Sequence, residues 1–211
     1  MKTVITIQHT QSVHHLNGMI GSWTDWELTD VGKERAENIG KRLSAELAGE
    51  DFKIYCSDLI RTRQTAEPLL RYLGAAAEYR PELREINLGS ACGKSNKWLR
   101  ENGAIVKAID DRSLPDAESG RDVWNRLSAF CDEIMATSND IVVVVAHGFV
   151  LPTWWAIWLK WDISMLDKAE FHGAAGGVSS MKETDEGKRV IMRLNDMSYS
   201  GEAYGLLELG R

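Results

Sequence analysis

The most hydrophobic stretch of the chain occupies residues 141–146, where Ile, four Val and Ala follow one another without a polar position. Such a run of mostly β-branched residues, with polar residues before it and a glycine soon after it, predicts a strand buried on both faces of a parallel sheet. Residues 3–7 form a second strand-like segment near the N-terminus. His147 follows the first of these strands directly, and His9 follows the second after one residue.

Helical periodicity alternates with further strand-like segments along the chain. Apolar residues recur at helical spacing after Thr29, after Ser57 and after Ser119, and again between about 150 and 161. We expect Ser57 to cap the helix that follows it. The remaining strand-like segments are 52–56, 77–80, 176–183 and 188–194. Strands alternating with helices predict a three-layer α/β/α sandwich with a mostly parallel central sheet.

Residues 87–118 show little periodicity, and we expect a loop there with a short helix near residues 97–102. This segment is a predicted active-site loop or cap. A hydrophobic fraction of 44% over 211 residues is enough for a single core, so residues 1–211 are predicted to form one domain.

The charge pattern narrows the range of partners. The net charge is −6 and no basic run occurs, so nucleic acid is not an expected partner. A small anionic substrate remains compatible, because a pocket can be locally positive in an acidic protein. No stretch approaches the roughly 18 apolar residues that a membrane span needs. The three cysteines lack CxxC spacing and the N-terminus lacks a leader pattern, so we expect a cytoplasmic protein.

Candidate reactive residues gather where the predicted strands end. In parallel sheets, ligands bind beyond the carboxyl ends of the strands. His9 and His147 lie there, Arg61 follows the second predicted strand, and Glu85 follows the third. Two imidazoles, a guanidinium and a carboxylate suit phosphoryl transfer. One histidine attacks phosphorus, the donors hold its oxygens, and the acid protonates the leaving oxygen.

Short motifs around these residues occur in an order known from one superfamily. Residues 8–12 (Gln-His-Thr-Gln-Ser) stand where that superfamily has Arg-His-Gly-(Glu/Gln)-(Ser/Thr). The other matching segments are 21–32, 57–66, 83–89, Glu118-Ser119 and 146–148. On these motifs the chain resembles the histidine phosphatases, the superfamily that includes the phosphoglycerate mutases. Several motifs in the right order are far more specific than one short match.

The resemblance implies a mechanism. His9 would be the nucleophile that forms a phosphohistidine, which water then hydrolyses. Arg61 and His147 would bind the phosphoryl oxygens, and Glu85 would be the proton donor. This chemistry needs no metal, and we expect no cofactor. The alternative is a metal cluster of the histidines at 9, 14, 15 and 147.

The first motif departs from the family pattern, because Gln8 replaces an arginine and Thr10 a glycine. A neutral amide binds an oxyanion less strongly than a guanidinium does. We hypothesise that His14 or His15, with Asn17, partly replaces the missing arginine. The alternative is a weakened enzyme, or a pseudo-enzyme that binds a phosphate ligand without turning it over.

The number of residues between Glu85 and His147 helps to distinguish a phosphatase from a mutase. Positions 86–146, 61 residues, separate Glu85 from His147, which leaves little room for the long insertion of the mutases. A phosphatase acting on a small phosphomonoester is therefore predicted, with a mutase as the alternative. We expect the leaving group to contact residues 14–26, residues 87–118 and the region of His172, where aromatic side chains and few charges favour a sugar, an aromatic or another weakly charged group. The predicted phosphate- and substrate-binding residues are Gln8, His14, His15, Asn17, Trp23 and Ser57.

A tryptophan-rich segment has two interpretations. Trp154, Trp158 and Trp161 share one face of the helix predicted there, with Trp155 to the side. Either these side chains belong to the core, or they form a homodimer interface, where tryptophan is enriched.

Overall fold

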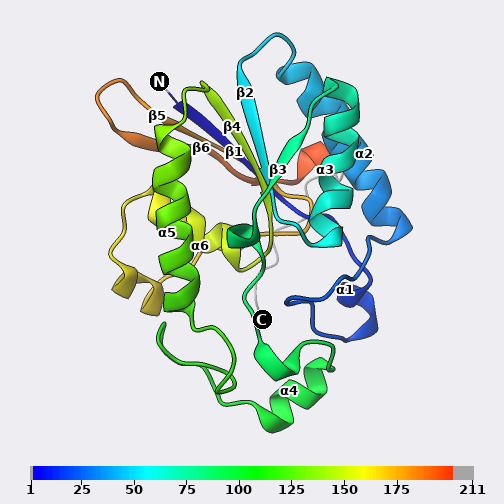
Figure 1. Cartoon of the computed structure of the whole chain (residues 1–211), viewed down its shortest axis with the longest axis vertical. Coiled ribbons are helices and arrows are strands. Elements are labelled where there is room, and N and C mark those ends of the chain that lie inside the picture. Colours follow the sequence, from blue (N-terminus) through cyan, green and yellow to red (C-terminus); the bar gives the residue numbers. More distant parts are fainter. Residues whose placement is uncertain (1, 202–211) are drawn as a thin grey trace.

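The structure is a computed structural model that describes residues 2–201. A six-stranded sheet crosses its centre in the order β3-β2-β4-β1-β5-β6 (Figure 1). The first four strands in this order are parallel to one another, and β5 and β6 continue the sheet in antiparallel fashion. The strands are β1 (Lys2–Gln8), β2 (Phe52–Cys56), β3 (Ala77–Tyr79), β4 (Ile141–Ala146), β5 (Val178–Glu183) and β6 (Arg189–Asp196).

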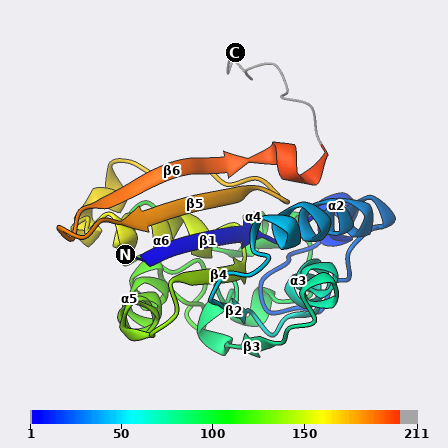
Figure 2. The same cartoon turned by 90° about the horizontal axis from the view of Figure 1, so that it is seen from above.

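Helices cover both faces of this sheet, as the view from above shows (Figure 2). α2 and α3 pack with one face and α5 and α6 with the other, each pair around its own hydrophobic cluster. The predicted three-layer sandwich is therefore confirmed. The helices are α1 (His14–Asn17), α2 (Asp30–Glu46), α3 (Ile60–Leu73), α4 (Asn96–Asn102), α5 (Gly120–Ala136) and α6 (Val150–Trp158).

The register of the central strands brings the two predicted histidines together. β1 and β4 are parallel neighbours, and Gln8 lies opposite Ala146. His9 and His147 are therefore the next residues on adjacent strands, and His9 N donates to Ala146 O over 3.0 Å. Ser57 N donates to Val145 O, so the end of β2 reaches the same level. The parallel register alone thus places three candidate residues at one edge.

The loop after β1 is fastened to the start of α2. A Cβ added to Gly32 would lie 1.9 Å from Gln11 O, so only a glycine allows this approach of helix and loop. Thr10 Oγ1 donates to Gly32 O over 2.8 Å, and Thr10 N donates to Thr65 Oγ1. The threonine that replaces the family's glycine therefore helps to hold the loop that carries His9.

Two local predictions differ from the structure. Ser57 does not cap the next helix: α3 begins at Ile60, its N-cap position is Leu59, and no side chain caps it. The Ser57 hydroxyl is instead bonded to His147. α1 was not predicted either, because a single helical turn has no apolar periodicity.

The segment 87–118 contains α4, as predicted, and lies with α1 beyond the carboxyl ends of the parallel strands (Figure 1). An antiparallel bridge between Met19 and Ser95 joins it to the loop after α1. Its role as a cap stays a prediction.

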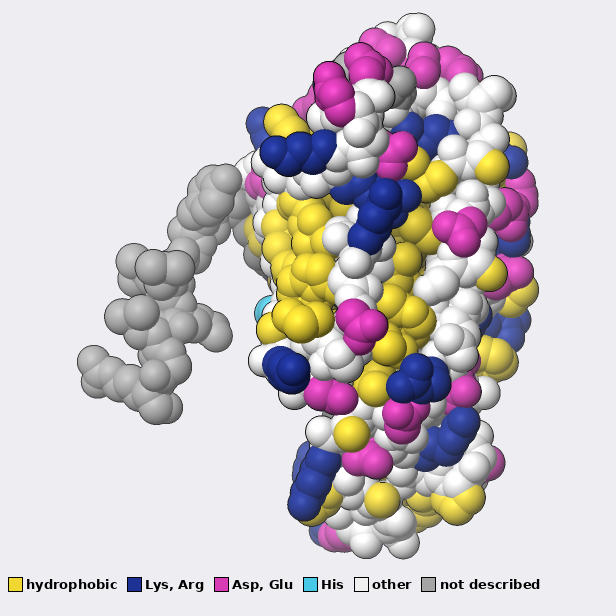
Figure 3. Space-filling view, turned by 90° about the vertical axis from the view of Figure 1, so that its left-hand side faces the viewer, with side chains coloured by type: hydrophobic (Ala, Val, Ile, Leu, Met, Phe, Trp, Pro, Cys, Tyr) yellow, Lys and Arg dark blue, Asp and Glu magenta, His cyan; other side chains and the backbone are white. Residues whose placement is uncertain are grey.

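The tryptophan-rich helix belongs mainly to the core. Trp154, Trp155 and Trp158 are each 2% exposed or less, and Trp161 packs against Phe171 with ring centroids 5.0 Å apart. Burial of the first three favours the core interpretation, because their side chains are not available to a second copy. The homodimer stays a prediction. Hydrophobic side chains gather on the side of the molecule that Figure 3 shows. No helix within residues 2–201 is long and apolar enough to cross a membrane.

Candidate active site

His9 is held in the tautomer that a nucleophile requires. Its side chain is buried, and Nδ1 lies 2.8 Å from the carbonyl oxygen of Thr10. Because a carbonyl can only accept, Nδ1 carries the proton and Nε2 keeps its lone pair. Arg61 Nε donates to that Nε2 over 3.3 Å. Burial, followed by the charge of Arg61, lowers the pKa of His9 well below its usual value, so the ring is neutral near neutral pH.

Arg61 supplies a fixed positive charge beside the nucleophile. It is 1% exposed and lies in the first turn of α3. Its terminal nitrogens donate to Thr24 O over 2.7 Å and to Ser22 O over 2.8 Å, which fixes the plane of the guanidinium. Burial lowers the pKa of Arg61 to about 10, so it remains cationic at neutral pH. A buried cation at this point is suited to an anionic group.

His147 lies next to His9 and has one unused ring nitrogen. Its Nε2 lies 2.8 Å from Ser57 Oγ, whereas its buried Nδ1 has no partner among the described residues. The rings of His9 and His147 are 5.2 Å apart. Burial, then Arg61, lowers the pKa of His147 well below normal. If the Ser57 hydroxyl donates to Nε2, the proton of the neutral ring is on Nδ1, where it can be given to an oxyanion.

The backbone and the carboxyl of Glu85 are both held by hydrogen bonds. Ile86 N donates to Oε1 over 2.8 Å, and Phe149 N donates to Oε2 over 3.2 Å. The Trp23 indole donates to the carbonyl oxygen of Glu85 over 2.6 Å. Burial of the carboxyl raises the pKa of Glu85 despite these donors, which favours the protonated form of a proton donor.

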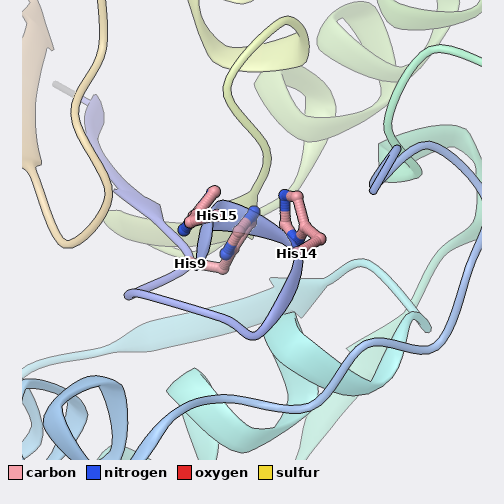
Figure 4. A group of neighbouring side chains, drawn as sticks. All are labelled: His9, His14 and His15. Atoms are coloured by element: carbon pink, nitrogen blue, oxygen red, sulfur yellow. The ribbon is translucent and has the colours of Figure 1, made fainter. Parts of the chain in front are cut away.

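The two histidines of α1 join His9 in one group of rings (Figure 4). The centroid of His15 is 5.4 Å from that of His9, and the centroid of His14 is 5.8 Å from it. Ser12 N donates to His15 Nδ1 over 3.2 Å, so in the neutral ring the proton is on Nε2, which becomes a donor. Burial, then His15, lowers the pKa of His14 to about 3, so this ring is neutral as well.

Nitrogen atoms of His9, His14 and His15 lie within 4.8 Å of one another, which is a candidate metal cluster. Two bonds oppose this use. His9 Nε2 already accepts from the cationic Arg61, and the Ser12 bond places a proton on His15 Nε2. A nitrogen that carries a proton cannot ligate a metal, and a guanidinium repels a dication. The arrangement therefore favours an anion over a metal ion.

The remaining predicted residues have other surroundings. Asn17 is exposed, and its Oδ1 accepts from Met19 N over 2.9 Å within its own turn. Gln8 is 7% exposed, and its Oε1 is buried without a partner in the described part of the chain. A Cβ added to Gly173 would lie 2.4 Å from this oxygen, and one added to Gly148 would lie 3.2 Å from Gln8 Nε2. The amide of Gln8 is thus packed between two backbone segments.

The sequence did not indicate how the site is supported. The carbonyl groups of Ser22 and Thr24 orient Arg61, and the N–H of Phe149 bonds to Glu85. These are backbone groups, which every residue has, so no sequence motif marks them. Ser22 also contributes its side chain, which donates to Ile86 O and accepts from Leu88 N. Only a tertiary structure reveals contacts of this kind.

Comparisons with known proteins find a matching family model and similar folds. The family model described as "Histidine phosphatase superfamily (branch 1)" matches residues 4–197. A probable phosphoglycerate mutase of Erwinia tasmaniensis is 26% identical over 163 residues, which cover 72% of each protein. The solved structure of Bacillus stearothermophilus YhfR has a TM-score of 0.81 at 25% identity and covers 95% of this chain and 100% of its own. A mycobacterial glucosyl-3-phosphoglycerate phosphatase has a TM-score of 0.79 at 19% identity, over 92% of this chain and 98% of that protein.

Proposed function

Because the chain belongs to the histidine phosphatase superfamily, branch 1, we propose that it hydrolyses a small phosphomonoester through a phosphohistidine on His9. The observation that supports this most strongly is the bond from His9 Nδ1 to Thr10 O. It keeps the proton off Nε2, which accepts from Arg61 Nε over 3.3 Å in the free protein and gives up that bond when it attacks phosphorus.

The proposed first step transfers the phosphoryl group to the enzyme. His9 Nε2 forms a bond to phosphorus while the bond from phosphorus to the ester oxygen breaks, and Glu85 gives its proton to that oxygen. Arg61 and the Nδ1–H of His147 hold the phosphoryl oxygens in the transition state.

In the second step, water attacks phosphorus and the carboxylate of Glu85 accepts its proton. The N–P bond then breaks and phosphate leaves. We expect no metal or cofactor in either step. Ser57 acts as a positioning residue, because its hydroxyl fixes the tautomer of His147.

His15 is proposed to replace part of the hydrogen bonding that the family's arginine supplies. It is exposed on α1, its Nε2–H is a free donor, and it lies next to His9. The side chain of Asn17 bonds within its own turn. We therefore propose that Asn17 supports His15 by ending α1 rather than by binding phosphate. Trp23 is proposed to hold the acid in place through the Glu85 carbonyl rather than to bind phosphate.

A mutase is the second candidate, since the Erwinia relative carries the name of a probable phosphoglycerate mutase. The short interval between Glu85 and His147 favours a phosphatase. Incubation with 3-phosphoglycerate separates the two, because a mutase interconverts phosphoglycerates faster than it releases phosphate, whereas a phosphatase only releases phosphate.

The direct test of the proposed function is the hydrolysis of p-nitrophenyl phosphate by wild type and His9→Ala. We expect turnover by the wild type and a loss of at least about 10³-fold in the variant, because the attacking group is gone. Binding of phosphate without any turnover by the wild type would instead support the pseudo-enzyme.

A further inference from the structure

A cavity of about 370 Å³ opens beside Glu85. It lies between the loop at residues 106–113 and the short 3₁₀ helix Ile163–Asp167. A second cavity, of about 180 Å³, shares part of its wall and extends to Gly148 and His172. The apolar side chains around the larger cavity are Ile86, Leu88, Val106, Ile109, Phe149 and Leu166.

Two lining residues connect the cavity with the proton donor, although Glu85 itself lines neither cavity. Ile86 and Phe149 line the larger cavity, and their backbone N–H groups hold the two oxygens of Glu85. Gly148, which lines the smaller cavity, directly follows His147. An ester oxygen that receives its proton from Glu85 would therefore carry the rest of the leaving group into this space.

Acidic side chains dominate the charge around the cavity. Asp111 accepts from two backbone N–H groups, which lowers its pKa and keeps it ionised, and Asp167 accepts from Ile109 N. Glu170, which borders both cavities, is exposed and has no ion-pair or hydrogen-bond partner among residues 2–201. Lys107 is the one Lys or Arg on this lining, which also carries Asp111, Asp167 and Glu170.

The fourth acidic residue, Glu118, makes little difference to this balance. It forms an ion pair with Arg126 over 3.0 Å, so its charge is neutralised locally. A leaving group that carried a carboxylate would meet net negative charge here, whereas a cationic group would be attracted.

We infer that these cavities bind the leaving group of the substrate and that they select the phosphomonoester of an amino alcohol. The apolar walls take the carbon skeleton, and Glu170 with its acidic neighbours attracts the cationic nitrogen. This inference rests on the proposed phosphatase function. The sequence predicts few charges around the leaving group. The acidic side chains around the larger cavity correct that expectation.

Three esters that differ mainly in charge test the inference. Phosphocholine is cationic, 3,3-dimethylbutyl phosphate is its neutral analogue of the same shape, and 3-phosphoglycerate adds a carboxylate. We expect kcat/KM to be about tenfold higher for phosphocholine than for the neutral analogue, and lowest for 3-phosphoglycerate. Equal values for the cationic and neutral esters, or a preference for 3-phosphoglycerate, would overturn the inference.

The variant Glu170→Gln should reduce the preference for phosphocholine over its neutral analogue by several-fold, because it removes a charge and keeps the shape. Glu186→Gln is the matched control: it removes an exposed carboxylate from the turn between β5 and β6, outside both cavities, and should leave the preference unchanged. A preference unaffected by Glu170→Gln would contradict the proposed role of this residue.

Binding of the free alcohols separates this inference from the proposed function. Choline should bind to the wild type more tightly than 3,3-dimethylbutanol in calorimetry, whether or not the protein turns over any ester. If p-nitrophenyl phosphate is hydrolysed but choline has no advantage, only the inference fails. If choline is preferred but no ester is hydrolysed, the proposed function fails and the binding site remains.

Discussion

The phosphate end of the site and the leaving-group cavities are built in opposite ways. His9, Arg61 and His147 are each 2% exposed or less, and backbone groups or Ser57 fix their side chains. The cavities instead lie between loops, and Glu170 at their rim is exposed. Strand ends that are tied to a packed sheet keep catalytic groups in place, while loops can vary without disturbing the core.

This difference suggests a division of roles. The residues at the strand ends carry out the reaction, and the loops around the cavities select the substrate. A change at the phosphate end should lower the rate for every ester by a similar factor. A change in the cavities should alter the order of the esters and leave the reaction itself intact. Variants in each region can therefore separate the two roles.

Arg61→Lys should have the largest effect. Lysine keeps the charge but cannot make the three directed bonds to His9, Ser22 and Thr24 that the guanidinium makes. We expect kcat/KM to fall by about 10²-fold for phosphocholine, its neutral analogue and p-nitrophenyl phosphate alike. Steady-state kinetics with the three esters measures this.

Arg63→Lys is the control, because Arg63 lies on the same helix with an exposed side chain over the Tyr79 ring. Its kinetics should match the wild type. A loss in Arg61→Lys that differed strongly between the three esters would show that the two regions are not separable.

Glu85→Gln should reduce kcat/KM less than Arg61→Lys does, and by a factor that depends on the leaving group. Glu85 lies between the phosphate end of the site and the leaving-group cavities. An alkoxide needs a proton and p-nitrophenolate does not, so we expect a loss of about 10²-fold for alkyl esters and only a few-fold for p-nitrophenyl phosphate. Equal losses for both kinds of ester would argue against proton donation by this carboxyl.

The pH profile checks the same role. Burial raises the pKa of Glu85, and the protonated carboxyl is the active donor. With alkyl esters, the wild-type rate should therefore fall as the pH rises through that raised pKa, and Glu85→Gln should lack this decline. The imidazole of His9, whose pKa is lowered, stays neutral throughout this range.

The phosphate end of the site could be predicted from the sequence much better than the leaving-group cavities. Apolar runs such as 141–146 and the order of strands and helices were enough for the sandwich, and the ends of these strands identified His9, His147 and Arg61. The register that places Gln8 opposite Ala146 follows from the parallel pairing of buried strands. These features are local patterns joined by regular geometry, so sequence reasoning can reach them.

The cavities arise from contacts that no local pattern encodes. Residues 106–113 and 163–170 have no shared periodicity, and they meet where Asp167 accepts from Ile109 N. The prediction that residues 87–118 and the region of His172 approach the same space agrees with the cavity linings, but their acidic charge could be assessed only from the structure. Ser57 was misassigned for a similar reason, because its true partner, His147, is 90 positions away.

The smallest effect is expected for Gln8→Arg. A longer, charged side chain has no room between Gly148 and Gly173, where the amide is already tightly packed. We expect no gain in kcat/KM for p-nitrophenyl phosphate, whereas His15→Ala should lower it by several-fold through the loss of a neutral donor. A large gain from Gln8→Arg would show that the natural site is a weakened one, and an unchanged rate in His15→Ala would exclude compensation by His15.

The most direct measurement is the site of phosphorylation during turnover. The enzyme is mixed with p-nitrophenyl phosphate, quenched within milliseconds under alkaline conditions that preserve phosphohistidine, and mapped by peptide mass spectrometry. The account predicts one phosphoryl group on the peptide that contains His9. Fragmentation of that peptide should locate the group on His9, and the group should be absent from His9→Ala. A phosphoryl group on His14, His15 or His147, or undiminished hydrolysis by His9→Ala, would contradict it.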